Sequence, residues 1–183
     1  VDTLVMNGAE CEPYLTADYR MMLSFPVEIV EGSLALARIV DAKQVKIGVE
    51  SDKPDAMRAI EDAIARVPDG GIPVEVVPCL ARYPQGAERQ LVLATTGRNV
   101  PLRQLPTAVG VLVQNVATAH AVHDALRYRR PLLDRVMTVT GPGVQEPRNV
   151  RAPLGTSLAD VVAFCGGLIV LPGDHYLVTR RDR

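Results

Sequence analysis

The strongest constraint on the fold is an alternation between short apolar runs and amphipathic segments with helical spacing. A β-branched run spans residues 43–49, an amphipathic segment opens at Pro54, and a second β-branched run follows at residues 72–77. Strand–helix–strand alternation of this kind builds parallel sheets with right-handed crossovers. An apolar run at residues 109–113 and a helical segment at residues 117–127 repeat the unit. We therefore predict an α/β fold, a Rossmann-like parallel sheet with helices on both faces.

Composition supports buried strands covered by helices and argues against several classes of protein. Aromatic residues make up 4% of the 183 residues and tryptophan is absent, so the core must consist of Val, Leu, Ala and Ile. The formal net charge of −1 gives no electrostatic case for a nucleic-acid partner. Three widely spaced cysteines without a CxxC argue against a disulfide framework, a zinc site and iron–sulfur ligands in this chain. No apolar run reaches the ~20 residues that cross a bilayer, so we expect no direct membrane span.

The pattern changes after residue 130, and we expect a second, smaller domain there. Residues 131–170 contain two extended segments and a short helix, which suits a β-grasp-like domain. The first domain then spans residues 1–130, and residues 171–183 form a tail without an interpretable pattern. The chain opens on an apolar run typical of the interior of a strand, so we expect it to be a fragment of a longer protein.

Polar side chains gather in three loops that follow predicted strands. The carboxyl ends of parallel strands meet at one edge of a sheet, and ligands bind there. The three loops span residues 7–13, 83–88 and 114–118. Their amide, hydroxyl and carboxyl groups suit a planar polar ligand such as a flavin. The candidate binding residues are Asn7, Glu10, Glu12, Tyr83, Gly86, Glu88, Gln114, Asn115 and Thr118.

Structural roles are open alternatives for several of these residues. Asn115 and Thr118 are residue types that cap helices. Glu10 and Glu12 suit the positive end of a helix dipole as solvated acids. Cys11 lies between these two carboxylates, which disfavour a thiolate and therefore argue against a redox-active cysteine.

Two histidines form a second candidate cluster. His120 and His123 lie three positions apart on a predicted helix, with Asp124 beside them. This spacing could ligate a metal ion, but a convincing third ligand is missing. We therefore predict a surface pair and no metal site.

Four motifs, in order, resemble one known family. They read NGAECEPYLTAD, RYPQGAERQL, GVLVQNVATAHAV and VTGPGVQEPRNVRAPLGTSLADV, and together they cover about residues 1–168. The chain resembles the central part of the RnfC/RsxC family, the C subunits of Rnf electron-transport complexes, which is related to the flavin subunit of respiratory complex I. The resemblance implies a Rossmann-like domain that binds FMN and receives hydride from NADH. It also implies that a β-grasp domain of the soluble-ligand-binding (SLBB) type follows.

The resemblance implies a role for each of the three loops. By motif position, the candidate residues of loop 7–13 are similar to a loop that contacts the flavin in the complex I relatives. The candidate residues of loop 83–88 resemble a loop that lies against the isoalloxazine and the nicotinamide. The candidate residues of loop 114–118 resemble a loop near the ribityl chain and the phosphate. Two departures affect the nucleotide contacts: Ala87 stands at an acidic position of the relatives, and Gln114 at an asparagine position.

The function implied by the resemblance is electron input. The chain would be part of the FMN-binding, NADH-oxidising subunit of a membrane-associated, ion-translocating NADH:ferredoxin oxidoreductase, and inactive as an isolated fragment. Its partners would be other subunits of that complex, NADH, and ferredoxin reached through iron–sulfur carriers. The subunit would be peripheral, at the cytoplasmic face of the bacterial inner membrane. A glycine-rich phosphate loop and the ligands of two [4Fe–4S] clusters would lie outside this chain, and no side chain would act as a catalytic nucleophile because the flavin carries the chemistry.

Two alternatives stay open. One is a flavin- and iron–sulfur-dependent cobalamin reductase of the same superfamily. The other, from a different class, is a non-catalytic scaffold that keeps the fold and docks partners through its β-grasp part. A titration with FMN separates the scaffold from both enzymes.

Overall fold

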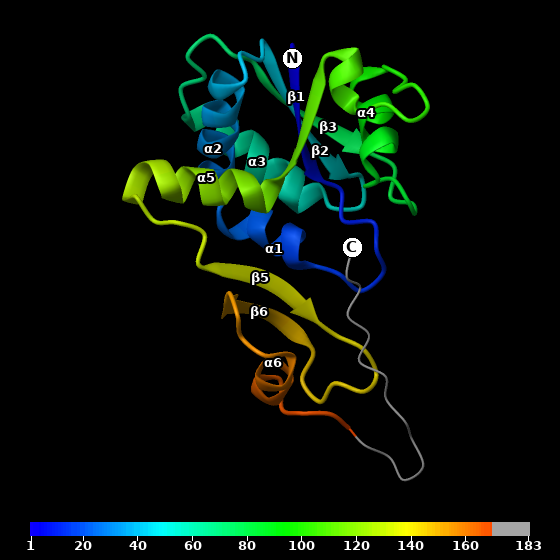
Figure 1. Ribbon diagram of the computed structural model, residues 1–183, viewed down its shortest axis with the longest axis vertical. Coiled ribbons are helices and arrows are strands. Elements are labelled where there is room, and N and C mark those ends of the chain that lie inside the picture. Colours follow the sequence, from blue (N-terminus) through cyan, green and yellow to red (C-terminus); the bar gives the residue numbers. More distant parts are fainter. Residues whose placement is uncertain (170–183) are drawn as a thin grey trace. The chain divides into compact units, whose positions relative to one another are not determined.

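In the computed structural model, a four-stranded parallel sheet forms the centre of the first of two units (Figure 1). Its strands lie in the order β3-β2-β1-β4, and every neighbouring pair is parallel. All four carboxyl ends therefore lie at one edge, and the predicted parallel sheet is confirmed. The strands are β1 (Thr3–Gly8), β2 (Gln44–Glu50), β3 (Val74–Cys79) and β4 (Val111–Asn115).

The structure describes residues 1–169. The first unit runs from Val1 to Leu133, and the second begins at Asp134. The tail predicted at residues 171–183 lies outside the described residues. No helix in the described part of the chain is long and apolar enough to cross a membrane.

Helices cover both faces of the sheet, as predicted (Figure 1). One face carries α4 (Glu88–Thr96), which contacts all four strands. The helices of the other face pack on one another as well as on the sheet. They are α1 (Ala17–Ser24), α2 (Pro26–Ile39), α3 (Pro54–Arg66) and α5 (Val116–Tyr128), and a short 3-10 turn, η1 (Pro106–Val109), precedes β4.

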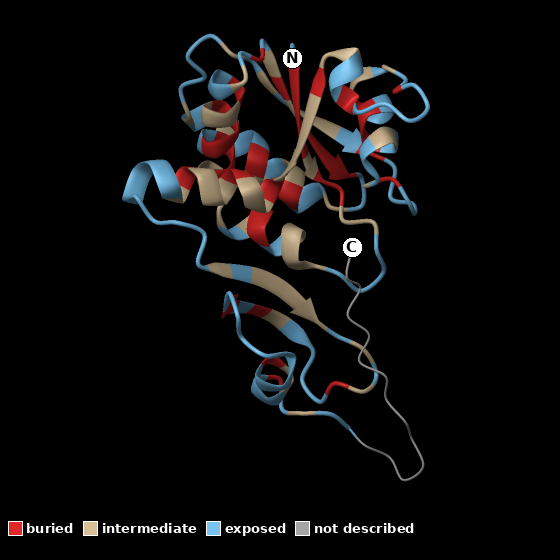
Figure 2. Cartoon of the chain, in the orientation of Figure 1, coloured by how far each residue is buried: buried red, intermediate tan, exposed pale blue. Residues whose placement is uncertain are grey.

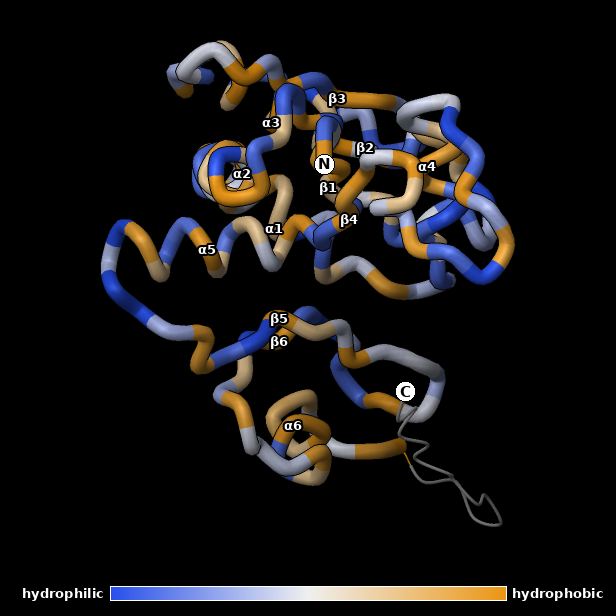
Figure 3. The backbone as a smooth tube through the Cα atoms, turned by 45° about the horizontal axis from the view of Figure 1, so that its top comes forward, coloured by the Kyte–Doolittle hydropathy of each residue, from blue (hydrophilic) through white to orange (hydrophobic). Residues whose placement is uncertain are grey.

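The core lies where the strands are apolar on both faces. Leu4, Val5 and Met6 of β1 are completely buried, since β1 is a central strand with helices above and below it. Figure 2 shows buried residues along β1 and β2 and on the helices around them, and Figure 3 shows apolar residues concentrated along the strands. Because parallel sheets are covered on both faces, their strands read as continuous apolar runs.

A glycine permits the close packing of α2 against α5. A Cβ added to Gly32 would lie 1.9 Å from the carbonyl oxygen of Ala119, which is far inside van der Waals contact. The two helices can therefore approach at this point only without a side chain on α2. This contact fixes the position of α5, whose first turn follows directly from the carboxyl end of β4.

The second unit contains an antiparallel strand pair and a helix. Strands β5 (Asp134–Val139) and β6 (Arg148–Pro153) pair with each other, and α6 (Leu158–Phe164) follows them. Ser157 caps α6, because its hydroxyl accepts a hydrogen bond from the Asp160 backbone N–H at 3.1 Å. The small core of the unit consists of Val144, Val150, Ala152, Val161 and Cys165.

Candidate functional site

Three loops at the carboxyl edge of the sheet converge on Asn7, near the end of β1. The amide Nδ2 of Asn7 donates a hydrogen bond to the carbonyl oxygen of Gly86 at 2.9 Å. Its Oδ1 accepts one from the Ala9 backbone N–H at 3.1 Å. Asn115 in turn donates from Nδ2 to the carbonyl oxygen of Asn7 at 3.5 Å. The structure therefore brings together the loops after β1, β3 and β4.

Gly86 crosses the β1 loop at very short range. A Cβ added to Gly86 would lie 2.2 Å from the carbonyl oxygen of Ala9 and 3.2 Å from Sγ of Cys11. Real Cβ atoms do not approach backbone oxygens that closely, so only glycine allows this crossing. The position of loop 83–88 against loop 7–13 therefore depends on the missing side chain.

Glu10, in the loop before α1, caps the N-terminus of that helix. Its two carboxyl oxygens accept hydrogen bonds from the backbone N–H groups of Asp18 and Tyr19, each at 3.3 Å. Partial burial raises the pKa of Glu10, and the charge of Asp18 adds to this, while the backbone hydrogen bonds oppose it. Thr16, which precedes α1, forms no capping bond with its side chain. Glu10 thus performs a structural role at a helix N-terminus and ties loop 7–13 to α1.

Asn115 caps α5 and links it to α1. Its Oδ1 accepts a hydrogen bond from the Ala117 backbone N–H at 2.8 Å, and its Nδ2 donates one to Oδ2 of Asp18 at 2.7 Å. The capping alternative left open for Asn115 is therefore observed. Thr118 lies inside α5 and does not cap it.

The other candidate side chains keep their polar groups available. Tyr83 is 69% exposed, and Glu88 is exposed at the first position of α4, where the helix dipole favours an acid. Gln114 and Thr118 are half-buried. The side chains of these four residues form no hydrogen bond with any residue that the structure describes. Glu12 is exposed, and the only hydrogen bond of its side chain within the described chain is a long contact with the Cys11 thiol at 3.9 Å.

Two further polar residues of this edge are absent from the candidates that the sequence predicts. Glu50, the last residue of β2, is 6% exposed, and Gln85 of loop 83–88 is 5% exposed. Neither side chain forms a hydrogen bond or ion pair with a described residue. Burial raises the pKa of Glu50, and the nearby charge of Asp52 raises it further. The predicted strand ends one residue too early, at Val49, and an acid that directly follows a buried run is the signal that could have found Glu50.

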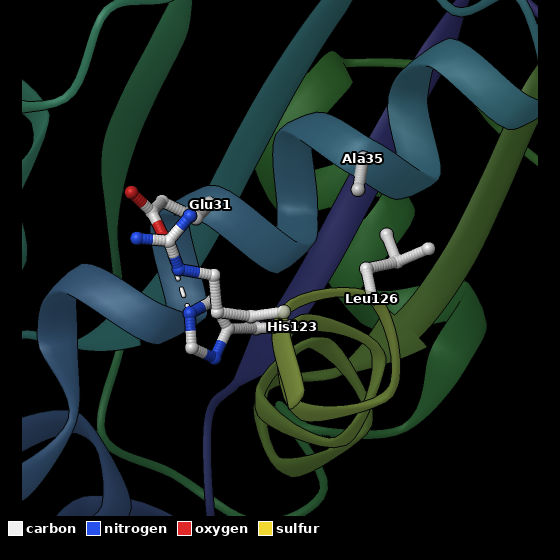
Figure 4. A pocket seen from close by; sticks show the side chains of 5 residues that line it. Glu31, Ala35, His123 and Leu126 are labelled. Carbon is white, nitrogen blue, oxygen red and sulfur yellow. Dashed lines mark ion pairs between the residues drawn. The ribbon is translucent and has the colours of Figure 1, made fainter. Parts of the chain in front are cut away.

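A separate polar cluster lies between α2 and α5, and Figure 4 shows it from close by. Nε2 of His123 lies 3.2 Å from Oε2 of Glu31, and its Nδ1 lies 3.3 Å from Oδ1 of Asp124. His123 is 7% exposed, so the prediction of a surface pair was wrong for this residue. Helix α5 turns His123 toward α2, where it lines a pocket of about 200 Å³ beside Leu126 and Arg127. Over residues 1–169, no three His, Cys, Asp or Glu side chains are grouped to hold a metal ion.

The available groups at the carboxyl edge fit a flavin. The edge of an isoalloxazine ring presents both hydrogen-bond donors and acceptors, and the hydroxyls and amides of Tyr83, Gln85, Gln114 and Thr118 offer both kinds. The side chains of Asn7 and Asn115 already bond within the protein and hold the loops in place. An open parallel sheet with such an edge is typical of the class of nucleotide- and flavin-binding α/β domains.

Comparison with family models gives the particular family. Residues 1–124 match the model of the Nuo51 FMN-binding domain, and residues 136–177 match that of the SLBB domain. The chain therefore belongs to the Nuo51 FMN-binding domain family, with an SLBB domain after it. The predicted β-grasp domain of SLBB type is confirmed.

Curated relatives agree with the predicted resemblance. The chain is 43% identical over 167 residues to the C subunit of a proton-translocating ferredoxin:NAD(+) oxidoreductase complex of Clostridium ljungdahlii, covering 91% of this chain and 35% of the relative. It is 44% identical over 170 residues to the C subunit of an ion-translocating oxidoreductase complex of Rhodobacter capsulatus, covering 93% of this chain and 32% of the relative. The resemblance to the RnfC family is confirmed. The chain spans about a third of the length of these relatives.

Solved structures show the same fold at lower sequence identity. The crystal structure of an NAD+-reducing [NiFe]-hydrogenase in the H2-reduced state matches with a TM-score of 0.76 at 21% identity, covering 91% of this chain and 33% of that chain. The air-oxidised state matches with a TM-score of 0.78, also at 21% identity, and covers 92% and 33%. At this identity the likeness establishes the fold.

Proposed function

We propose that this chain forms the flavin-binding part of the electron-input subunit of an Rnf-type, ion-translocating NADH:ferredoxin oxidoreductase. FMN would bind at the carboxyl edge of the sheet, with NADH beside it. The family match to the Nuo51 FMN-binding domain supports the flavin, and relatives named as ferredoxin:NAD(+) oxidoreductase subunits support the nicotinamide and the electron acceptor.

The observation that carries the proposal is the convergence of three loops on Asn7. Two of these loops come from strands that are not neighbours of each other, β3 and β4, and they lie on either side of β1 in the sheet order. Side chains with available donors and acceptors, such as Tyr83 and Gln114, are thereby brought to one edge. A planar ligand needs contacts from several directions, and this convergence supplies them.

The protein would supply orientation, while the cofactor supplies the redox chemistry. A bound flavin accepts hydride from a reduced nicotinamide and releases electrons singly. Tyr83 would lie against the ring, and Gln114 and Thr118 would bond to its polar groups. Glu88 would orient the nicotinamide through its exposed carboxylate. No residue of the chain would act as a nucleophile.

Asn7, Glu10 and Asn115 would preorganise the site. Glu10 fixes loop 7–13 to the first turn of α1, and Asn115 fixes the start of α5 to Asp18 of the same helix. Loops held by such bonds lose less conformational freedom when a ligand binds. We further propose that the full-length protein is peripheral at the cytoplasmic face of the membrane, with two [4Fe–4S] clusters held by other segments of that protein.

Binding and reduction in the full-length protein test this function. FMN affinity is measured by quenching of flavin fluorescence, and flavin reduction by NADH is followed by absorbance under anaerobic conditions. Asn7→Ala removes the hydrogen bond that joins loop 7–13 to Gly86 and a second one that shapes loop 7–13 itself, so we expect FMN to bind at least about tenfold more weakly. The matched control is Asn99→Ala, which changes an exposed asparagine between α4 and β4 and should leave the affinity unchanged.

Two results would reject the proposal. If the wild-type full-length protein binds no FMN, the non-catalytic scaffold is the correct class. If FMN binds but NADH does not reduce it, the electron-input role is wrong although the flavin site is present.

A further inference from the structure

The last turn of α5 and the chain that follows it, residues 125–133, form a basic segment on the surface of the first unit. Every residue of this segment is exposed, which makes it the longest exposed run among residues 1–169. It contains three arginines and no acidic residue, although the formal net charge of the whole chain is −1. The positive charge is therefore concentrated locally.

The basic segment also exposes large apolar side chains. Leu126 is 63% exposed and Tyr128 is 66% exposed, and Leu132 and Leu133 are exposed after them. Single apolar residues on a surface are ordinary, but here four lie within one short stretch and flank the arginines. Such a mixture of leucine, tyrosine and arginine is typical of segments that lie at a membrane surface.

Helix ending explains only part of this composition. Arg127 lies in the last turn of α5, where the helix dipole favours a cation. Arg129 ends the helix in the left-handed conformation, with φ of 54°, which glycine or asparagine adopts more readily. The backbone N–H groups of Arg129 and Arg130 both bond to the carbonyl oxygen of Asp124, so the three arginines stay close to the helix end. Neither effect requires the exposed leucines.

The charges of the basic segment are available to a partner. The guanidinium groups of Arg127 and Arg129 form no hydrogen bond or ion pair with any described residue. The acids near this end of α5 are engaged elsewhere, because the carboxylates of Glu31 and Asp124 both lie against the ring of His123. An anionic partner would therefore not have to displace an existing ion pair from these two arginines.

The shape of this region favours a broad surface over a peptide. The end of α5 projects past α2 in two views of the first unit (Figures 1 and 3). The pocket beside it holds about 200 Å³ and is lined in part by Glu31, which would repel an acidic side chain. Peptides bind in grooves or along sheet edges, and small ligands usually occupy pockets of about 300–1,000 Å³. A projecting end with exposed leucines can instead enter a deformable surface.

We propose that residues 125–133 bind the anionic surface of a lipid membrane. Arg127 and Arg129 would lie at the lipid phosphates, while the leucines and Tyr128 would enter the boundary between headgroups and acyl chains. This proposal rests on the peripheral membrane location given under the proposed function, and it specifies the surface that makes the contact. It does not depend on the flavin site.

Vesicle binding of the full-length protein, purified without other subunits, tests this proposal. Affinities are measured by co-sedimentation with phosphatidylcholine vesicles that contain or lack phosphatidylglycerol. We expect the wild type to bind the anionic vesicles at least about tenfold more tightly. Arg127→Gln combined with Arg129→Asn removes both charges and keeps a residue that tolerates the left-handed conformation, and it should weaken this binding at least about tenfold. Leu132→Ser combined with Leu133→Ser should weaken it by a similar factor.

Each double variant has a matched control elsewhere on the first unit. Arg58→Gln combined with Arg66→Gln removes the same charge from exposed positions of α3. Leu102→Ser combined with Leu105→Ser changes two other exposed leucines. Both controls should alter vesicle affinity less than about threefold, since neither touches the basic segment. Melting temperature and FMN affinity are measured for every variant, and if one test variant loses stability the other decides.

The possible results separate this proposal from the proposed function. Equal affinity of the wild type for the two kinds of vesicle, or equal losses in test and control variants, overturns the membrane contact. A wild type that binds poly-L-glutamate but not anionic vesicles also overturns it and assigns the segment to an acidic protein partner. If these failures occur while FMN still binds and NADH reduces it, the proposed electron-input role stands. If anionic vesicles bind selectively but FMN does not bind, the flavin function alone is rejected.

Discussion

Replacing Gly86 by alanine should separate the loops on which the proposed flavin site depends. The added methyl group would lie 2.2 Å from the carbonyl oxygen of Ala9, whereas ordinary contacts begin near 3.4 Å. The two backbones would therefore have to move apart by about 1 Å, which stretches the 2.9 Å bond from Asn7 to Gly86 beyond hydrogen-bonding distance. Overpacking costs about 1–3 kcal/mol and the lost bond about 1 kcal/mol, so we expect the free energy of unfolding to fall by roughly 2–4 kcal/mol.

FMN binding is the more sensitive assay for Gly86→Ala. Because the Tyr83 side of the site moves with Gly86, we expect the dissociation constant for FMN in the full-length protein to rise at least about thirtyfold. Ala65→Ser is the matched control, since it adds one atom to an exposed residue of α3 and should leave the FMN affinity unchanged and the free energy of unfolding within about 0.5 kcal/mol. The movement would break the hydrogen bond between Asn7 and Gly86, on which the arrangement of the loops depends. If Gly86→Ala keeps both the FMN affinity and the free energy of unfolding of the wild type, the reasoning is refuted.

Two further predictions concern stability. Gly32→Ala places a methyl group 1.9 Å from the carbonyl oxygen of Ala119 and should lower the free energy of unfolding by roughly 3 kcal/mol in chemical denaturation, whereas Gly71→Ala, where an added Cβ has open space around it, should cost less. The pKa of Glu50 is raised in the folded protein from an ordinary value near 4.5, so the folded state holds this proton more tightly than the unfolded state. The contribution of the protonated Glu50 to the free energy of unfolding is complete below pH 4.5 and is lost as the pH rises through the higher pKa of the folded state. The free energy of unfolding of Glu50→Gln, measured relative to wild type, should therefore be higher at pH 7 than at pH 4. A constant difference between the two proteins across this range would show that Glu50 does not titrate with folding.

The sequence predicted the sheet well because its two central strands, β1 and β2, are largely buried. Residues 109–113 are apolar throughout and residues 43–49 are rich in β-branched residues, and amphipathic segments with helical spacing occur between such runs. These are local signals, and they determine the order of strands and helices along the chain. The positions of the three loops followed from the same logic, since parallel strands end at one edge.

Long-range contacts explain what the sequence could not predict. Thr16 has the residue type of a helix cap, but Glu10, brought close by the β1 loop, bonds the first N–H groups of α1 instead. His123 has a surface-like neighbourhood in the sequence, but Gly32 lets α2 approach α5 so closely that the histidine is buried. In both cases the deciding partner lies outside the helix concerned, and residue type alone carries no information about it.

Hydrogen bonds within the protein identify the residues that hold the loops of this edge in place. Asn7, Glu10 and Asn115 bond through their polar groups to the backbone and to Asp18, so their contribution to a ligand is the geometry of the loops. The carboxyl group of Glu50 forms no hydrogen bond within the described chain, and its oxygens reach solvent although most of the residue is buried. Partial burial raises the pKa of Glu50, so its ionised form opposes folding rather than stabilising it.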